Sequence, residues 1–169
     1  MANVQNIVGL VPALGNDGQQ VVVGQAEYLA YVPLSDGTVK AGKFCFKKTN
    51  SGAGEKFALA SLTGGVGAEP LGFVERVVDT RIDGANAATD VYPEGAALTV
   101  AIRGQYYITA PASIAADSLK VFVEPSTGAI TIAAAAESGS TAVDTGWVCR
   151  IPNGGTSAAK DDLVIVERF

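Results

Sequence analysis

Histidine is absent from this chain of 169 residues, which excludes several familiar kinds of active site. Histidine is the general base of Ser-His-Asp and Cys-His nucleophile pairs and a frequent zinc ligand. The only cysteines are Cys45 and Cys149, far apart in the sequence, so a disulfide framework and a four-cysteine zinc site are also excluded. We expect two free, buried thiols in a protein that is not an enzyme and binds no cofactor or metal.

Long apolar runs and an excess of positive charge are missing too. No stretch approaches the roughly 18 consecutive apolar residues of a membrane-spanning helix, and the first residues lack the basic start of a signal peptide. Twelve basic against seventeen acidic residues give a net charge of -5, the wrong sign for binding a phosphate backbone. We therefore expect no secretion signal, no membrane contact and no nucleic-acid partner.

Small and β-branched residues make up the bulk of the chain. Alanine, glycine and valine supply 67 of 169 positions, and valine plus isoleucine number 29 against 11 for leucine plus methionine. β-Branched side chains suit a pleated sheet. Turn signals separate short apolar runs along the whole chain, which predicts an all-β protein: an antiparallel β-sandwich or barrel, jelly-roll-like, with little helix. The expected strands are 21–23, 27–32, 39–47, 57–62, 71–78, 97–103, 105–110, 119–124, 130–134, 147–151 and 163–168.

We expect one β-rich domain over residues 20–169. Residues 1–19 form either its first strand or an extended arm that pairs with another chain. In the second case Ile7, Val8 and Leu10 would supply the apolar contacts. The alanine-rich stretches 112–119 and 133–138 are long enough for only a turn or two of helix.

Two local patterns make specific structural predictions. Leu119, Val121 and Val123 share one face of a strand, and Ser126-Thr127-Gly128 then reverses the chain, which predicts a hairpin that ends in Ile130 and Ile132. The second pattern is the stretch 97–110, where Gly104 interrupts an apolar alternation. We interpret Gly104 as a bulge or bend that lets one long strand pass from one sheet to another.

Two near-motifs are rejected. Residues 37–43 match the glycine and lysine positions of a phosphate-binding loop, but Phe44 stands where the magnesium-binding hydroxyl belongs, and strand rather than helix should follow. The acidic loop 79–94 has the spacing of a calcium loop, but Arg81 occupies a ligand position. A solvated loop is favoured there over an improvised calcium site, whose ligands would be Asp79, Asp83, Asp90 and Glu94.

Surface chemistry offers three weaker candidates. Lys40, Lys43, Lys47 and Lys48 fit the exposed face of one strand, which either meets an acidic partner or is simply solvated. The adjacent Asp161 and Asp162 would point to opposite faces of a strand, so a carboxylate-only glycosidase has no support. A third set of residues, aromatic, could line a carbohydrate-binding face, although core packing is favoured: Tyr28, Tyr31, Tyr106, Tyr107 and Trp147.

The order of the strand sequences resembles a known family. The matching strings are DGTVKAGKF at 36–44, PLGFVE at 70–75, EG at 94–95 leading into LTVAIRGQYY at 98–107, VFVEPSTGAIT at 121–131, TGWV at 145–148 and LVIVE at 163–167. Together they are similar to the head cement, or capsid decoration, proteins of tailed bacteriophages. The likeness covers about residues 20 to 169.

This resemblance implies a β-rich virion structural protein without catalytic residues, assembled in the host cytoplasm. Such a protein binds the outside of the capsid, bridges neighbouring subunits of the major capsid protein and stabilises the head as a homo-oligomer, dimer or trimer. The contacts would come from Ile7, Val8, Leu10, Lys40, Lys43 and Lys47. The alternative is a tail or baseplate module that binds host-surface glycans through the tyrosine-rich face.

Overall fold

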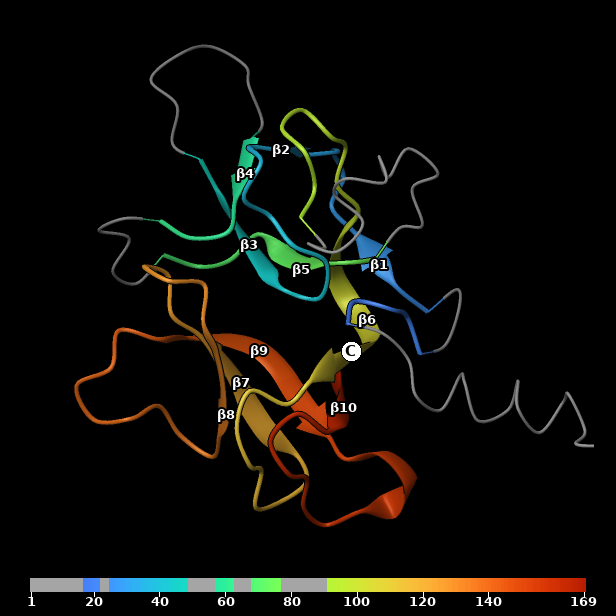
Figure 1. Cartoon of the computed structure of the whole chain (residues 1–169), viewed down its shortest axis with the longest axis vertical. Helices are drawn as coiled ribbons and strands as arrows, with labels where there is room; N and C mark the ends of the chain where they lie inside the picture. Colours follow the sequence, from blue (N-terminus) through green and yellow to red (C-terminus); the bar gives the residue numbers. More distant parts are fainter. Residues whose placement is uncertain (1–16, 22–24, 49–56, 63–67, 77–90) are drawn as a thin grey trace, which may run out of the picture.

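The short β-branched runs form strands, as expected. The computed structural model describes residues 17–21, 25–48, 57–62, 68–76 and 91–169, and strands are the dominant regular structure in them (Figure 1). These ranges contain no α-helix, only a 3-10 turn, η1, at Pro152–Gly154. The alanine-rich stretches 112–119 and 133–138 therefore form no helix. No helix in the described ranges is long and apolar enough to cross a membrane.

The strands form one mixed sheet rather than a closed barrel. Its order is β2-β4-β3-β5-β6-β10-β9-β7-β8, with β1 paired to β6 outside this path, and the β2–β4 pair is parallel. The all-β prediction is confirmed, and among the described strands this parallel pair departs from antiparallel pairing. The strands are β1 Glu27–Tyr28, β2 Leu34–Ser35, β3 Phe44–Lys47, β4 Phe57–Leu59, β5 Gly72–Val74, β6 Val100–Thr109, β7 Leu119–Val123, β8 Ile130–Ala133, β9 Val143–Arg150 and β10 Leu163–Arg168.

Strand β6 belongs to both halves of the molecule. Its first residues pair with β1 and β5, and its last six pair with β10 (Figure 1). Two clusters of buried side chains lie along it. The smaller contains Val39, Cys45, Ala58, Val74, Leu98 and Val100. The larger contains Phe44, Phe46, Phe73, Ala101, Tyr106, Ile108, Ala110, Ile114, Val121, Val123, Ile130, Trp147, Cys149, Val164 and Val166.

Gly104 marks the point at which β6 changes the face it presents to the larger core. Before it the odd-numbered Ala101 lies in that core, and after it the even-numbered Tyr106 and Ile108 do. An unbroken strand would keep one parity, because side chains alternate between faces. The backbone of Gly104 has φ 138°, a conformation that side-chain-bearing residues rarely adopt. The change at this glycine agrees with the predicted bend, but both parts of β6 belong to one mixed sheet, so the strand does not pass from one sheet to another.

The predicted hairpin is also confirmed. Strands β7 and β8 pair antiparallel, with Val121 opposite Ile132 and Val123 opposite Ile130. Val121, Val123 and Ile130 lie in the larger core. The Gly128 backbone approaches the preceding half of the chain so closely that an added Cβ would lie 2.4 Å from the carbonyl oxygen of Ala60. The turn of this hairpin therefore packs directly against the residues that follow β4.

Candidate interaction surface

The first described residues are fastened to β6. The carboxylate of Asp17 accepts hydrogen bonds from the backbone N–H and the hydroxyl of Thr109, at 2.5 and 2.7 Å. The N–H of Gly18 donates to the carbonyl of Tyr107 at 2.8 Å, and the N–H of Tyr107 donates to Gln19 at 2.9 Å. Residues 17–21 thus act as a short strand along β6, and the chain before them starts from a rigid point.

A second set of contacts holds the same segment from its other side. The N–H of Arg76 donates to the carbonyl of Gly18, and the Arg76 guanidinium donates to the carbonyl of Asp17, both at 2.8 Å. Gly18 and Gly42 touch backbone to backbone, because a Cβ on Gly18 would lie 2.6 Å from the Gly42 nitrogen. Both glycines have positive φ, so neither position suits a larger residue.

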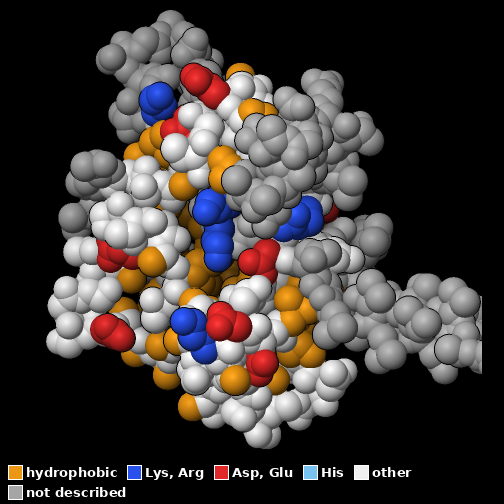
Figure 2. Space-filling view, viewed as in Figure 1, with side chains coloured by type: hydrophobic (Ala, Val, Ile, Leu, Met, Phe, Trp, Pro, Cys, Tyr) orange, Lys and Arg blue, Asp and Glu red, His pale blue; other side chains and the backbone are white. Residues whose placement is uncertain are grey.

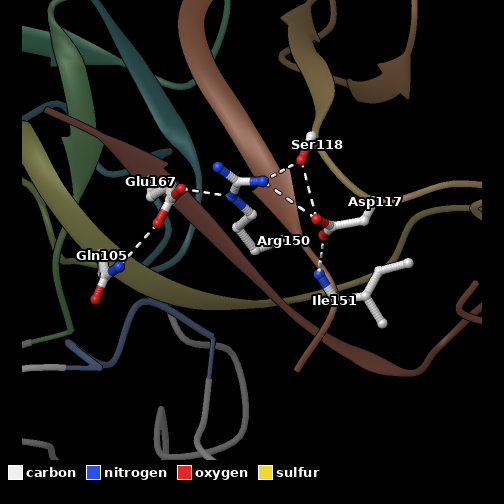
Figure 3. Close-up of polar contacts among 6 residues, drawn as sticks. All are labelled: Gln105, Asp117, Ser118, Arg150, Ile151 and Glu167. Atoms are coloured by element: carbon white, nitrogen blue, oxygen red, sulfur yellow. Dashed lines mark hydrogen bonds and ion pairs between the residues drawn. The ribbon is translucent and has the colours of Figure 1, made fainter. Parts of the chain in front are cut away.

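The outer face of the sheet carries a network of charged and polar side chains (Figure 3). Glu167 of β10 accepts from Gln105 at 2.8 Å and from Arg150 of β9 at 2.6 Å. Arg150 also reaches Asp117 at 3.1 Å and donates to the Ser118 hydroxyl. The network therefore joins β6, β10 and β9 to the segment that precedes β7, and it fixes the position of Arg150 at a surface where nearly half of its side chain is exposed.

These contacts shift the protonation equilibria of the acidic groups. The backbone N–H of Ile151 donates to Asp117 at 2.8 Å and is the main cause that lowers the pKa of this carboxyl. The hydrogen bond from Lys120 to Asp144, also 2.8 Å, lowers the pKa of Asp144. The hydrogen bond to Glu167 raises the pKa of Arg150. Asp117 and Asp144 therefore stay negatively charged and Arg150 stays positively charged near neutral pH, so this face presents paired charges to any partner.

The aromatic residues proposed for a carbohydrate-binding face do not lie together on the surface. Tyr106 and Trp147 are fully buried, with ring centroids 6.0 Å apart, so they cannot stack against a sugar. The Tyr106 hydroxyl donates to Glu75 at 3.3 Å, and burial followed by the charge of Glu75 raises the pKa of Tyr106. Tyr28 remains 43% exposed. Core packing, the interpretation favoured from the sequence, is therefore correct for the two central aromatic residues.

The lysine prediction needs a correction. Lys40, Lys43 and Lys47 do not share the exposed face of one strand, because a turn at residues 41–42 intervenes and β3 begins only at Phe44. Strand β3 is buried on both faces, since Phe44 and Phe46 face the larger core and Cys45 the smaller. The sequence did not reveal this second burial. Lys40 and Lys47 are nevertheless exposed, and Lys43 is partly so.

The structure tests some of the other predicted sites, and others lie outside the described residues. Both cysteines are free and buried, as expected, and they lie in different cores. The strand, not helix, that follows residues 37–43 agrees with the rejection of a phosphate-binding loop. Three of the four residues of the improvised calcium site, and all three of the apolar residues of the arm, lie outside the described ranges: Asp79, Asp83, Asp90, Ile7, Val8 and Leu10. The described ranges hold no cluster of three or more metal-ligating side chains.

The surface shows no dominant area of one charge on the face seen in Figure 2. Acidic and basic side chains are interspersed there, with hydrophobic side chains between them. The large apolar side chains that stand out into solvent within the described ranges are Tyr28, Val32 and Phe169.

A protein-family model matches nearly the whole chain. The family model described as "Structural cement protein (E217 gp24/Pam3 gp6)" matches residues 4–168 of the chain. No curated protein matches the sequence significantly. The matched range includes both cores, the anchored segment 17–21, the network of Figure 3 and most of the residues that precede Asp17.

Proposed function

Because the chain belongs to the structural cement protein family of phages, we propose that it binds the outer surface of the assembled capsid and bridges neighbouring subunits of the major capsid protein. The observation that carries this proposal is the match across residues 4–168, which is nearly the whole chain. Its location would be the exterior of the virion, after a soluble stage in the host cytoplasm.

In the proposed mechanism, many weak contacts between cement protein and capsid add up to stabilise the shell. Each copy makes a modest interface with two neighbouring capsid subunits, so separating those subunits requires breaking the cement contacts as well. Because the shell presents many equivalent sites, small contributions sum over the whole particle and raise its resistance to internal pressure. A rigid body suits this role, since a flexible bridge would lengthen before it resisted separation.

The segment before Asp17 is the first proposed contact. The hydrogen bonds from Thr109 to Asp17 fix the point from which this segment starts. A load applied to an arm that carries Ile7, Val8 and Leu10 would pass directly into β6, the strand shared by both cores. Sixteen residues can extend up to about 50 Å, so the arm would contact a neighbour that lies within this distance of Asp17.

The lysines around the start of β3 are the second proposed contact. Lys40 and Lys47 are exposed and Lys43 is partly exposed. On a chain with a net charge of -5, these cations offer a local site for acidic side chains of the capsid. Contacts of this kind raise the association rate and weaken as salt is added.

The test adds purified protein to expanded shells that lack it. We expect the protein to co-sediment with the shells and to raise the temperature and force at which they break. A variant lacking residues 1–16 tests the arm, and the triple variant Lys40→Glu, Lys43→Glu, Lys47→Glu tests the basic site. Lys160→Glu, at another exposed lysine, is the matched control for charge.

Three outcomes separate the possibilities. Loss of binding in the triple variant but not in Lys160→Glu assigns the lysines, and loss only on deletion of residues 1–16 assigns the arm. Failure of the intact protein to co-sediment or to strengthen the shells would overturn the proposal. Recovery of the protein in tails rather than heads would point instead to the glycan-binding alternative.

A further inference from the structure

Strand β8 ends the sheet and leaves one edge open. It pairs with β7, and no backbone hydrogen bond joins its other edge to any part of the chain that the structure describes (Figure 1). The opposite end of the sheet differs, because Ser35 of β2 donates its N–H to the carbonyl of Ala96. An open strand edge carries unpaired N–H and C=O groups that can accept another strand.

The register fixes which groups of β8 point outward. The N–H of Glu124 donates to Ala129 at 2.8 Å, so this pair is hydrogen-bonded. Hydrogen-bonded and non-hydrogen-bonded pairs alternate along an antiparallel ladder. Thr131, opposite Phe122, is therefore bonded to β7, whereas the backbone groups of Ile130 and Ile132 point away from it. The open edge offers two donors and two acceptors.

Strand β8 also lacks the usual protection against pairing. Natural edge strands carry lysine, proline or inward-pointing charges that repel a second strand. The sequence Ile130-Thr-Ile-Ala133 has none of these. Ile132 packs against the larger core but is only partly buried, while the Thr131 side chain is exposed. This edge is therefore uncharged, although the chain as a whole carries a net charge of -5.

We propose that the outer edge of β8 binds the same edge of a second copy, antiparallel, about a two-fold axis at Thr131. In this register Ile130 faces Ile132 of the partner copy in both directions, so all four outward groups form hydrogen bonds. The isoleucine side chains meet on the inner face, which covers the exposed part of Ile132. The two Thr131 side chains face each other in a non-hydrogen-bonded pair.

Two features of the β8 sequence favour a second copy of the chain as the partner of this edge. The pattern Ile-Thr-Ile is symmetric about its centre, so one interface satisfies both edges and closes the assembly as a dimer. The absence of charge removes the repulsion that two identical charged strands would suffer. This dimer is independent of capsid binding, so either proposal can fail without the other.

Substituting Thr131 with a charged residue tests the proposed two-fold axis directly. The wild type is expected to sediment as a dimer, while Thr131→Lys and Thr131→Glu should each shift to monomer, because like charges would lie face to face. An equimolar mixture of the two variants should restore the dimer, an outcome that unfolding cannot produce. Thr156→Lys, at an exposed threonine of the loop before β10, should remain dimeric.

A cross-link gives a second, geometric readout. Opposed residues of a non-hydrogen-bonded pair lie within the Cα separation that a disulfide requires, so Thr131→Cys should form a covalent dimer on mild oxidation. Thr156→Cys should not, and both native thiols are buried. A wild type that stays monomeric, or a dimer that neither Thr131 charge variant weakens, would overturn the proposal.

Discussion

The ring of Tyr106 lies over Gly104, so close that a Cβ on the glycine would sit 2.9 Å from Cε2 of Tyr106 and 3.2 Å from the Cβ of Ala26. The ring is fully buried and cannot move aside without disturbing Phe73, whose centroid is 5.0 Å away. The missing side chain at Gly104 therefore allows both the switch of faces in β6 and the position of Tyr106 in the core.

Gly104→Ala should lower the free energy of unfolding by about 2 to 3 kcal/mol, since it adds both a steric overlap and backbone strain. Chemical denaturation measures the loss. Gly139→Ala is the matched control, because Gly139 also has positive φ but nothing within 4 Å of its Cβ position. It should lose only about 1 kcal/mol, the cost of strain alone. Equal losses in the two variants would contradict the role assigned to Tyr106.

Asp17→Ala should loosen the start of the described chain. The substitution removes the acceptor of two hydrogen bonds from Thr109, and bonds to a charged acceptor contribute about 1.5 to 3 kcal/mol each at most. We expect faster cleavage of residues 1–16 by a protease in limited digestion, with the rest of the fold intact. Glu137→Ala, at an exposed acidic residue, should leave the cleavage rate unchanged.

Acid should destabilise the fold through Asp117 and Asp144. Both carboxyls have a pKa lowered from 3.8 by hydrogen bonds in the folded state. Their contribution is therefore full above about pH 4 and is lost as the pH falls through the folded-state values. Lys120→Met should make unfolding less dependent on pH in this range, because the hydrogen bond from Lys120 is the main cause at Asp144. Arg150→Met should have a smaller effect, because the backbone N–H of Ile151 remains bonded to Asp117. Both effects are small because the pairs are exposed. Identical pH profiles for wild type and both variants would exclude this origin.

The native thiols should resist alkylation. Burial raises the pKa of Cys45 and of Cys149 from 9.0 to about 12, which reduces the reactive thiolate by about a thousandfold at a fixed pH. At pH 8 we expect negligible labelling by iodoacetamide in the folded protein and complete labelling in denaturant. Rapid labelling of either cysteine under native conditions would show that its core opens.

Local signals in the sequence were sufficient for the features that depend on few residues. The hairpin of β7 and β8 follows from an alternation of valines and one turn, and the change of face in β6 follows from a single glycine within an apolar alternation. Both are short-range geometry, so propensity and spacing decide them.

Features that depend on distant contacts were missed or misplaced. The run 27–32 predicts a full strand, but strand β1 covers only Glu27–Tyr28, and the two-residue β2 carries no recognisable pattern. The strand expected over 147–151 begins earlier, because β9 starts at Val143 and pairs with β7 on both sides of Gly146 by means of a register shift. The burial of β3 on both faces likewise depends on two cores that no local pattern reveals.

The passage of β6 through both cores has a consequence for how the protein comes apart. Because one strand supplies Val100 to the smaller core and Ile108 to the larger, neither core can open while the other keeps its strand in place. The two halves are thus coupled into one cooperative unit, and heat should melt them in a single transition. A protein with this coupling stays fully folded until both cores unfold together.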